Sequence, residues 1–414
     1  MASFSFGAGN ARKLLSIPLY AAGGLLTRLI PRSRDQWVFG CAVGIADGAL
    51  ALWEEATARG ERAVWLTGTA DEAREAERRG IPHVRKTGLR GFWRTARARV
   101  VVVTHGFGDV NRYAVAGAVL VQLWHGIPLK RIGLDSAETL RSGILPDSRI
   151  VRGMLRRMYA GATRRIRVLP AASHLVRGRL ESAFGLPAER VPVTGEPRVD
   201  VLSRGTADER RRRARAAIDR VAGPLPDDTR VVLYAPTWRD GAPDPAVPSP
   251  EEWRTLLEVL ERSDAVLLVR SHPLGAGEYR PPVGTDRVRS LGSDLVADVT
   301  PLLPGMDVLI TDYSSLAFDA GLVPLPVVFL APDLAEYRAR RGMYGRYTDV
   351  AGEDWAASWT QACAQLEAVL RDPDERTARS FALSEHMHAY RDGRNTERVY
   401  RAIRAALGAP RGVS

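Results

Sequence analysis

Cysteine and lysine are both scarce in this 414-residue chain. The two cysteines, Cys41 and Cys363, lie far apart in the sequence. They support neither a disulfide framework nor a zinc site, so a reducing compartment is expected. Lysine occurs only as Lys13, Lys86 and Lys130, so the net charge of +11 comes almost entirely from arginine. This charge suits an anionic partner, either a membrane surface, a nucleic acid or a phosphate-rich substrate, although genomic composition explains it equally well.

Common nucleotide-binding motifs and long apolar runs are also absent. No GxGxxG or Walker sequence and no internal repeat occurs, which excludes those two phosphate-binding loops. The uncharged run Leu14–Thr27 has 14 residues, short of the ~20 needed to cross a bilayer, and no clear signal-peptide cleavage site follows it. Residues 1–34 instead form a basic amphipathic segment that fits the interface of an anionic membrane. An ordinary helix packed on the first domain is the alternative.

The length and composition indicate a soluble protein with two domains. Apolar residues make up 45% of the chain and charged residues 26%, as in globular proteins, and 414 residues suit two domains of roughly 150–200 residues each. Short apolar runs alternate with helical patterns, which predicts parallel α/β sheets. The predicted strands are Trp37–Phe39, Ala63–Leu66, Val100–Thr104, Val119–Leu123, Val168–Pro170, Val191–Thr194, Val231–Tyr234, Ala265–Val269, Val308–Thr311 and Val327–Phe329.

The domain boundary is predicted between the two series of strands. The basic run 209–215 and the Gly- and Pro-containing loop 222–228 lie there. The arginines of this run indicate a solvated helix face rather than a nucleic-acid site. The predicted domains are therefore residues 35–220 and residues 221–390.

The segment from Asp307 to Asp319 is the most informative. A short buried strand is followed by the polar residues 312–315, which end in Ser314 and Ser315, and then by a helical pattern. Paired serines at a helix start bring hydroxyls and unpartnered backbone N–H groups together, which favours a phosphate. Capping of the helix by a serine is the alternative.

A histidine follows the predicted strand Val119–Leu123. His125 precedes Gly126 and Pro128, and ligands in open α/β sheets bind outside the carboxyl ends of the strands. With an ordinary pKa of ~6.5, a histidine there can act as a general base. A structural histidine that bonds to loop carbonyls is the alternative. Lys130 either holds a phosphate or lies in solvent.

Other strand ends carry basic or polar residues. Thr237 and Arg239 follow one strand, and arginine suits bidentate phosphate binding. Arg270 and His272 follow the next, where they are expected to face the same crevice as the paired serines; a structural role for His272 is the alternative. His105 either lines an acceptor cleft or has no reactive role.

Two acidic residues, Asp312 and Asp319, could coordinate a divalent cation. Each lacks a clear acidic partner in the sequence, so roles in orienting hydroxyls or capping helices are favoured.

Seven segments, in this order, resemble the CDP-glycerol glycerophosphotransferase family, which includes teichoic-acid polymerases and primases of bacterial cell walls. The segments span roughly residues 100–400. They are Trp124–Lys130, Thr194–Asp200, Leu233–Arg239, Arg270–Pro273, Leu309–Asp319, Arg341–Tyr344 and Arg391–Asn395. Each is weak by itself, but seven in one order are specific.

The resemblance implies a GT-B architecture, with two Rossmann-like domains whose parallel sheets face each other across a cleft. The C-terminal half would bind the CDP-alcohol, the N-terminal half would present the acceptor, and a helix in residues 391–414 would cross back to the first domain. The two essential histidines of the family fall on His125 and His272, and its donor-diphosphate serines fall on Ser314 and Ser315. The further substrate-binding residues would be Lys130, Arg198, Thr237, Arg239, Arg270, Asp312 and Asp319.

Together, these features predict a transferase that moves glycerol phosphate from CDP-glycerol to a hydroxyl of a teichoic-acid or related glycopolymer acceptor and releases CMP. His125 would take the acceptor proton, and the cations and hydroxyls would offset phosphate charge. The acceptor would be a lipid-linked or polymeric polyol phosphate at the inner face of the cytoplasmic membrane, with the enzyme cytoplasmic and peripheral. No nucleic acid partner and no definite cofactor is expected, and a divalent cation stays open.

Three alternatives differ in donor or in class. The first is ribitol phosphate transfer from CDP-ribitol. The second is a GT-B glycosyltransferase with a nucleotide sugar, in which carbon rather than phosphorus is attacked. The third is a non-catalytic basic protein that binds a membrane or a nucleic acid, which the strand-end histidines argue against because electrostatic binding does not need them.

Overall fold

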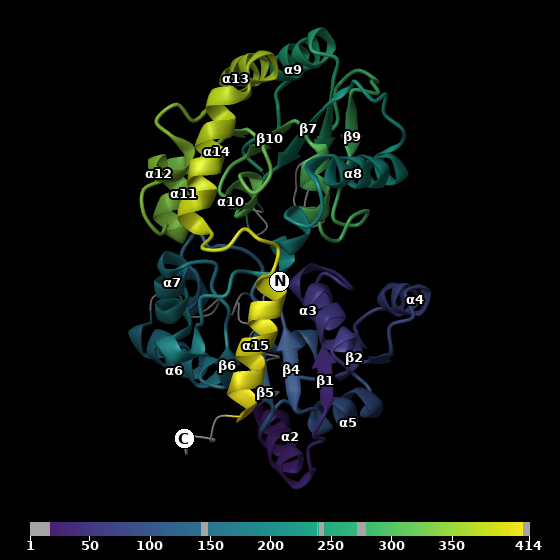
Figure 1. The fold of residues 1–414 in the computed structure, drawn as a ribbon. Coiled ribbons are helices and arrows are strands. Elements are labelled where there is room, and N and C mark those ends of the chain that lie inside the picture. Colours follow the sequence, from purple (N-terminus) through teal and green to yellow (C-terminus); the bar gives the residue numbers. More distant parts are fainter. Residues whose placement is uncertain (1–16, 142–147, 238, 240–243, 271–278, 409–414) are drawn as a thin grey trace. The chain divides into compact units, whose positions relative to one another are not determined.

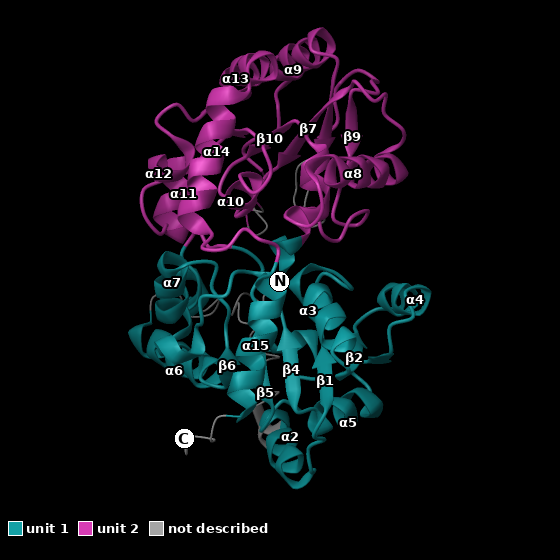
Figure 2. Cartoon of the chain, in the orientation of Figure 1, with its two compact units in different colours: residues 1–126, 131–200, 394–414 teal, residues 127–130, 201–393 magenta. Residues whose placement is uncertain are grey.

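Two separate parallel β-sheets organise the chain (Figure 1). The structure, a computed structural model, describes residues 17–141, 148–237, 239, 244–270 and 279–408. Each sheet belongs to one of two units (Figure 2). The first unit comprises residues 1–126, 131–200 and 394–414, and the second comprises residues 127–130 and 201–393. The predicted α/β class with two Rossmann-like sheets is confirmed.

The first unit is built on a six-stranded sheet with the order β3-β2-β1-β4-β5-β6. All neighbouring strands pair in parallel. The order reverses between β1 and β4, as in a doubly wound Rossmann-like sheet. The strands are β1 (Gln36–Phe39), β2 (Arg62–Thr67), β3 (His83–Arg85), β4 (Val100–Val103), β5 (Val119–Gln122) and β6 (Ile166–Val168).

Side-chain caps begin several helices of the first unit. Thr69, Ser148 and Ser173 each accept a hydrogen bond from the backbone N–H three residues later, which satisfies a donor at the helix start. The α-helices are α2 (Ile17–Leu29), α3 (Asp47–Ala58), α4 (Ala70–Arg78), α5 (Leu89–Arg97), α6 (Arg149–Thr163), α7 (His174–Phe184) and α15 (Asn395–Gly408). The 3₁₀ turns are η1 (Phe107–Asp109), η2 (Gly133–Asp135), η3 (Glu138–Leu140), η4 (Ala188–Arg190) and η5 (Pro197–Leu202).

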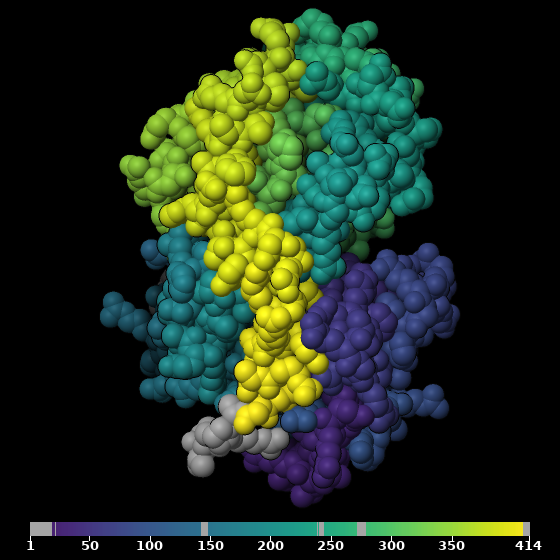
Figure 3. All heavy atoms as spheres, viewed as in Figure 1, coloured from purple at the N-terminus to yellow at the C-terminus, as the bar shows by residue number. Residues whose placement is uncertain are grey.

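The C-terminal helix α15 completes the core of the first unit. Its residues Val399, Tyr400 and Ile403 are buried in the cluster that includes Trp37 and Phe39. The Tyr400 ring stacks on the Trp37 ring, with centroids 5.7 Å apart. Figure 3 shows α15 in yellow along this unit with α3 in purple beside it. The last helix of the chain thus packs with strands from its beginning.

A buried aspartate fixes the start of α15. The carboxylate of Asp200 accepts hydrogen bonds from the backbone N–H groups of Asn395 (3.0 Å) and Thr396 (2.8 Å). It also accepts from the Thr396 hydroxyl at 2.6 Å. A carboxylate at a helix N-terminus satisfies donors that the helix leaves unpaired, so Asp200 ties the two distant parts of the first unit together.

The second unit is built on a five-stranded parallel sheet with the order β11-β10-β7-β8-β9. Here the order reverses between β7 and β10, which is again the Rossmann-like arrangement. The strands are β7 (Arg230–Ala235), β8 (Ala265–Val269), β9 (Val288–Ser290), β10 (Val308–Thr311) and β11 (Val327–Phe329). The helices are α8 (Ala207–Ala222), α9 (Pro250–Arg262), η6 (Thr300–Gly305), α10 (Leu316–Ala320), α11 (Leu334–Arg341), α12 (Thr348–Ala351), α13 (Trp359–Arg371) and α14 (Asp374–Met387).

Helix α8 belongs with the second unit. Its buried residues Ala214 and Ile218 pack on η6, where the backbone of Gly305 comes so close that a Cβ would lie 3.0 Å from both side chains. The division at residue 220 that the sequence suggests falls inside this helix. The two units instead change at Asp200 and Val201, because the buried face of α8 packs on the second sheet's own connections.

The strand predictions differ from the structure at a few places. Val191–Thr194 is not a strand; Val193 forms only an isolated bridge with Ala171, because Pro192 lacks the N–H that a strand ladder needs. The strand predicted at Val168–Pro170 ends at Val168. The three-residue edge strands β3 and β9 were not predicted, since they carry no long apolar run.

Candidate active site

The loops that follow β7 and β10 lie side by side in the second unit, because these two strands pair directly. The chain segments that begin at Pro236 and at Asp312 therefore leave the sheet at the point where the strand order reverses, which is where open α/β sheets bind ligands. The backbone N–H of Thr237 donates to both carboxylate oxygens of Asp312, at 2.9 and 3.1 Å. The structure thus brings together four of the predicted substrate-binding positions, those at Thr237, Asp312 and the paired serines.

Arg239 is held by two carboxylates rather than left open to a ligand. Its Nη1 lies 2.8 Å from Asp312 Oδ2, and its Nε and Nη2 donate to Asp333 at 2.8 and 3.0 Å. The Arg239 side chain is 7% exposed. Burial works to lower the pKa of the guanidinium, but Asp312 and Asp333 outweigh it and raise this pKa above its ordinary value. Arg239 therefore connects the segments that follow β10 and β11 through ion pairs with Asp312 and Asp333. The sequence predicts a direct contact with phosphate instead.

Asp333 is a further residue of the charged cluster formed with Arg239 and Asp312, and it is not among the residues predicted from the sequence. It stands just before α11 and accepts the Tyr313 hydroxyl at 2.9 Å in addition to Arg239. The rings of Tyr313 and Tyr337 lie 5.0 and 5.1 Å from the Arg239 guanidinium carbon, within cation–π range. Asp333 follows β11, which pairs with β10, so it leaves the sheet beside Asp312. No local pattern in the sequence shows this pairing.

The paired serines begin the short helix α10. The Ser314 hydroxyl accepts the backbone N–H of Leu316, the first residue of α10, at 3.3 Å. Ser315 is the N-cap residue, and its side chain makes no capping hydrogen bond. Both serines are partly exposed. Because α10 has five residues, the serine hydroxyls and backbone N–H groups matter more for an anion than the helix dipole.

Lys130 lies in the short stretch, residues 127–130, that packs with the second unit. Its backbone bridges to Met343, and Tyr344 donates its N–H to the carbonyl of Leu129 at 2.9 Å. Burial and the charge of Arg341 lower the pKa of the Lys130 ammonium to about 8, with Asp312 acting in the opposite direction. Lys130 therefore belongs to the same charged cluster as Asp312 and stays mostly protonated at neutral pH.

His125 lies in the first unit, at the turn that follows β5. Trp124 before it has a φ of 64° and Gly126 after it has a φ of 123°, so the backbone on both sides adopts the left-handed region, which is uncommon for tryptophan. The His125 ring stacks on the ring of His105 with centroids 4.2 Å apart and planes 5° from parallel. Gly126 alone separates His125 from Ile127, the first residue that packs with the second unit.

The remaining predicted residues have partners elsewhere. Arg198 is buried with its Nε 3.4 Å from Glu196 Oε2. Arg270 donates to the carbonyls of Leu291, Val296 and Ala297 at 2.8 to 3.3 Å, and in the described ranges no hydrogen bond or ion pair joins it to another predicted site residue. His272 lies outside the described residues.

Both predicted acidic residues contact protein groups. Asp312 accepts N–H groups of Thr237 and Tyr313 and pairs with Arg239. Asp319 is fully buried 3.7 Å from the Nε2 of His388. Among the residues that the structure describes, no group of three or more His, Cys, Asp or Glu side chains could hold a metal ion. Asp312 thus connects the loop after β7 with the turn that carries Ser314 and Ser315.

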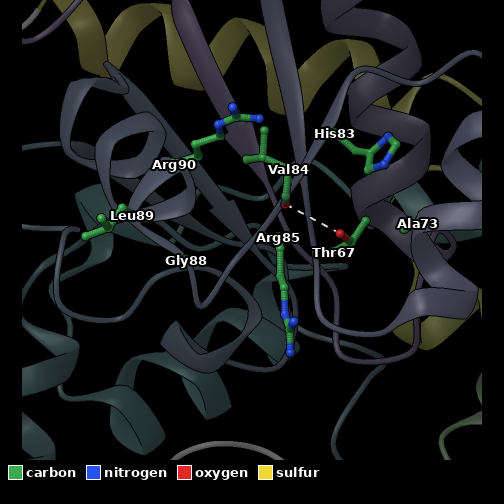
Figure 4. Close-up of a pocket in the computed structure, with 8 residues that line it drawn as sticks. All are labelled: Thr67, Ala73, His83, Val84, Arg85, Gly88, Leu89 and Arg90. Atoms are coloured by element: carbon green, nitrogen blue, oxygen red, sulfur yellow. Dashed lines mark hydrogen bonds between the residues drawn. The ribbon is translucent and has the colours of Figure 1, made fainter.

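A pocket of about 490 Å³ lies in the first unit, where β2 and β3 end (Figure 4). Its two arginines, Arg85 and Arg90, extend in opposite directions in this view. No predicted site residue lines it. The lining residues are Thr67, Ala73, His83, Val84, Arg85, Gly88, Leu89 and Arg90.

Comparison with known proteins decides the family. The model of the family described as CDP-Glycerol:Poly(glycerophosphate) glycerophosphotransferase matches residues 28–405. The chain belongs to this family. It is thus an enzyme of the glycerophosphotransferase class, and the family predicted from the seven sequence segments is confirmed.

Relatives of this glycerophosphotransferase match most of its length. It is 25% identical over 401 residues to the teichoic acid glycerol-phosphate transferase of Staphylococcus aureus (strain NCTC 8325 / PS 47), a match that covers 95% of this chain and 98% of that protein. It is 24% identical over 332 residues to the teichoic acid poly(glycerol phosphate) polymerase of Bacillus subtilis (strain 168), covering 79% of this chain and 42% of that protein. The solved structure of the wall teichoic acid polymerase TagF has the same fold, with a TM-score of 0.75, 22% identity and 96% of each chain covered.

No helix within the described part of this glycerophosphotransferase combines the length and the apolar character needed to cross a membrane.

Proposed function

We propose that this chain transfers glycerol phosphate from CDP-glycerol to a hydroxyl of a teichoic-acid-type acceptor and releases CMP. The acceptor oxygen forms a bond to the phosphorus that carries glycerol, the bond from that phosphorus to the CMP oxygen breaks, and the acceptor proton passes to His125. The products are the acceptor extended by one glycerol phosphate and CMP. One observation carries this proposal: in a chain of the glycerophosphotransferase family, Thr237 and Arg239 contact Asp312 at the strand reversal of the second sheet.

In this mechanism the second unit binds the donor. Ser314 and Ser315 donate their hydroxyls to the diphosphate, and Lys130 supplies positive charge. His272, which has no described geometry, is proposed to contact the leaving phosphate. Protein groups contribute to phosphoryl transfer mainly by positioning and by offsetting charge, so no covalent intermediate is needed. The ion pairs of Arg239 favour a role in shaping this site over a direct contact with phosphate.

The first unit supplies the base. His125 follows the carboxyl end of β5, and an imidazole can accept the proton of an attacking hydroxyl. Two residues later the chain enters the second unit, so the proposed base is covalently next to the segment that carries Lys130. We propose that Arg198, paired with Glu196, supports the acceptor side.

The reaction is tested by following CMP. The purified protein is incubated with CDP-glycerol and a lipid-linked or polymeric polyol-phosphate acceptor, with acceptor-free samples as the control. We expect CMP release that depends on the acceptor. If CMP is released from CDP-ribitol but not from CDP-glycerol, the transferred group is ribitol phosphate rather than glycerol phosphate. Release of a nucleoside diphosphate from a nucleotide sugar, with none of CMP, would refute phosphoryl transfer altogether.

The proposed role of Ser314 and Ser315 in binding the donor phosphates is tested separately by CMP affinity. Replacing Ser314 and Ser315 together by alanine is expected to weaken CMP binding by roughly 10²- to 10⁴-fold, because two hydrogen bonds to a charged group are lost and each contributes about 1.5–3 kcal/mol. Isothermal calorimetry measures this affinity directly. Ser290→Ala is the matched control, since Ser290 also ends a strand of this sheet but lies at its edge. Equal CMP affinities in all three proteins would remove the serines from the donor site.

We further propose that helix α2 contacts the inner surface of the cytoplasmic membrane, where a lipid-linked acceptor would be found. Leu25, Leu26 and Leu29 are 63%, 51% and 75% exposed, so a large apolar surface of one helix lies uncovered. Arg28 lies between them, and the chain carries a net charge of +11. Exposed leucines beside basic residues suit an anionic lipid interface.

Membrane contact is tested by exchanging leucines for serines. The triple change Leu25→Ser, Leu26→Ser and Leu29→Ser is expected to lower affinity for anionic phospholipid vesicles at least ~10-fold, since burial of each leucine contributes about 1.5–3 kcal/mol. Cosedimentation with vesicles measures the affinity. Leu175→Ser is the control, because Leu175 is an exposed leucine of another helix, α7. Unchanged cosedimentation, or a change in oligomeric state without a change in vesicle binding, would show that α2 has another partner.

A further inference from the structure

His105 and His125 come from neighbouring strands of the first sheet. His105 follows β4 and His125 follows β5, and these strands pair in parallel register. The two imidazole rings are 5° from parallel with centroids 4.2 Å apart. Since the N–H groups of an imidazole lie in the ring plane, face-to-face rings cannot hydrogen-bond to each other. The contact therefore fixes the plane of the His125 ring and leaves its nitrogen-bearing edge uncovered by His105.

Hydrogen bonds with Asp109 and Thr104 hold both the backbone and the ring of His105. One carboxylate oxygen of Asp109 accepts the backbone N–H groups of Thr104, His105 and Gly106, at 2.9, 2.8 and 3.3 Å. The Thr104 hydroxyl lies 2.8 Å from the Nδ1 of His105. Both the backbone and the ring of His105 are thus held by groups that belong to β4 and its following turn. A ring anchored in this way can hold a second ring in place.

His105 is also an uncharged neighbour. Burial lowers its pKa to about 4, so its ring is neutral throughout the range in which an enzyme at neutral pH works. A positively charged ring at 4.2 Å would oppose the uptake of a proton by His125, because like charges disfavour the protonated form. The neutral ring gives orientation without that penalty.

We propose that His105 is a positioning residue whose stacked ring holds the imidazole of His125 in the orientation needed to take the acceptor proton. The proposal rests on the general-base role of His125 given above. It assigns to His105 no proton transfer and no contact with the donor.

Two substitutions separate stacking from other roles of His105. His105→Ala removes the ring and is expected to lower kcat roughly 10- to 100-fold, in the range that misplacement of a reacting group by about 1 Å produces. The KM for CDP-glycerol should change less than about twofold. His105→Phe keeps a flat ring and should restore kcat to within about threefold of the unchanged protein. His174→Ala, at an exposed histidine of the same unit, is the control, and thermal midpoints confirm folding.

The stack is read independently of turnover by proton NMR of the histidine rings. The Cε1–H resonance of His125, assigned from its loss in His125→Ala, should carry a ring-current shift that disappears in His105→Ala and persists in His105→Phe. This signal tests the stack even if no CMP is released, so failure of the proposed reaction is distinguished from failure of this proposal. An unchanged kcat in His105→Ala, or equal loss in the alanine and phenylalanine variants, overturns it.

Discussion

The substitution His125→Ala is expected to lower kcat by roughly 10²- to 10⁴-fold, the range that general-base catalysis supplies. CMP binding is expected to stay unchanged. The separation follows from the two units. His125 belongs to the first, whereas the serine turn proposed to bind the donor belongs to the second. Loss of the base should therefore remove chemistry without removing the donor site.

Single-turnover measurement of CMP release, beside calorimetry with CMP, distinguishes these two effects. His174→Ala serves as the control because that histidine is exposed on α7. A His125→Ala protein with near-normal turnover would show that another group takes the proton. A variant that loses CMP affinity as strongly as turnover would place His125 in donor binding instead.

The second large effect is on stability. Arg239→Leu is expected to lower the free energy of unfolding by about 3–5 kcal/mol, the cost of removing one partner from a buried ion pair. The substitution leaves the carboxylates of Asp312 and Asp333, whose side chains are 3% and 14% exposed, without their shared cation. Urea unfolding followed by intrinsic fluorescence measures the loss, and adding Asp333→Asn to the variant should recover part of it by removing one uncompensated charge.

Arg346→Leu is the matched control for Arg239. Arg346 also pairs with an aspartate, Asp349, but their side chains are 74% and 51% exposed, and exposed pairs contribute about 0–1 kcal/mol. If Arg239→Leu loses CMP affinity while its unfolding free energy stays within about 1 kcal/mol of the unchanged protein, Arg239 binds phosphate and the ion-pair network is not its main role.

The strands and the residues that end them were accessible from the sequence because each depends on local pattern. Val308–Thr311 and the serines after it read as a strand followed by a turn and a helix, and the structure has β10 and α10 there. What the sequence could not show is which strands pair. β7 and β10 are separated by more than 70 residues, so the hydrogen bond from Thr237 to Asp312 follows only from the sheet order.

The same reasoning explains what was missed. Asp333 is one of many acidic residues in the sequence, and its importance arises because β11 pairs with β10 and sets it beside Arg239. The pairing of β4 with β5 likewise brings His105 onto His125. Arg239 was expected to bind phosphate because arginine suits that task, yet its two aspartates come from distant loops that no local pattern connects to it.

The position of α15 has a consequence for the order of synthesis. A chain that grows from its N-terminus forms all strands of the first sheet early, yet Val399, Tyr400 and Ile403 are the last residues to join the cluster around Trp37. Domains made on the ribosome generally fold in the order in which they emerge. In this protein the first unit begins to emerge before the second, but its core is completed by α15 only after the second unit, which ends at residue 393, has emerged. The histidine proposed as the base therefore gains its complete supporting core only after residues 399–403 have emerged.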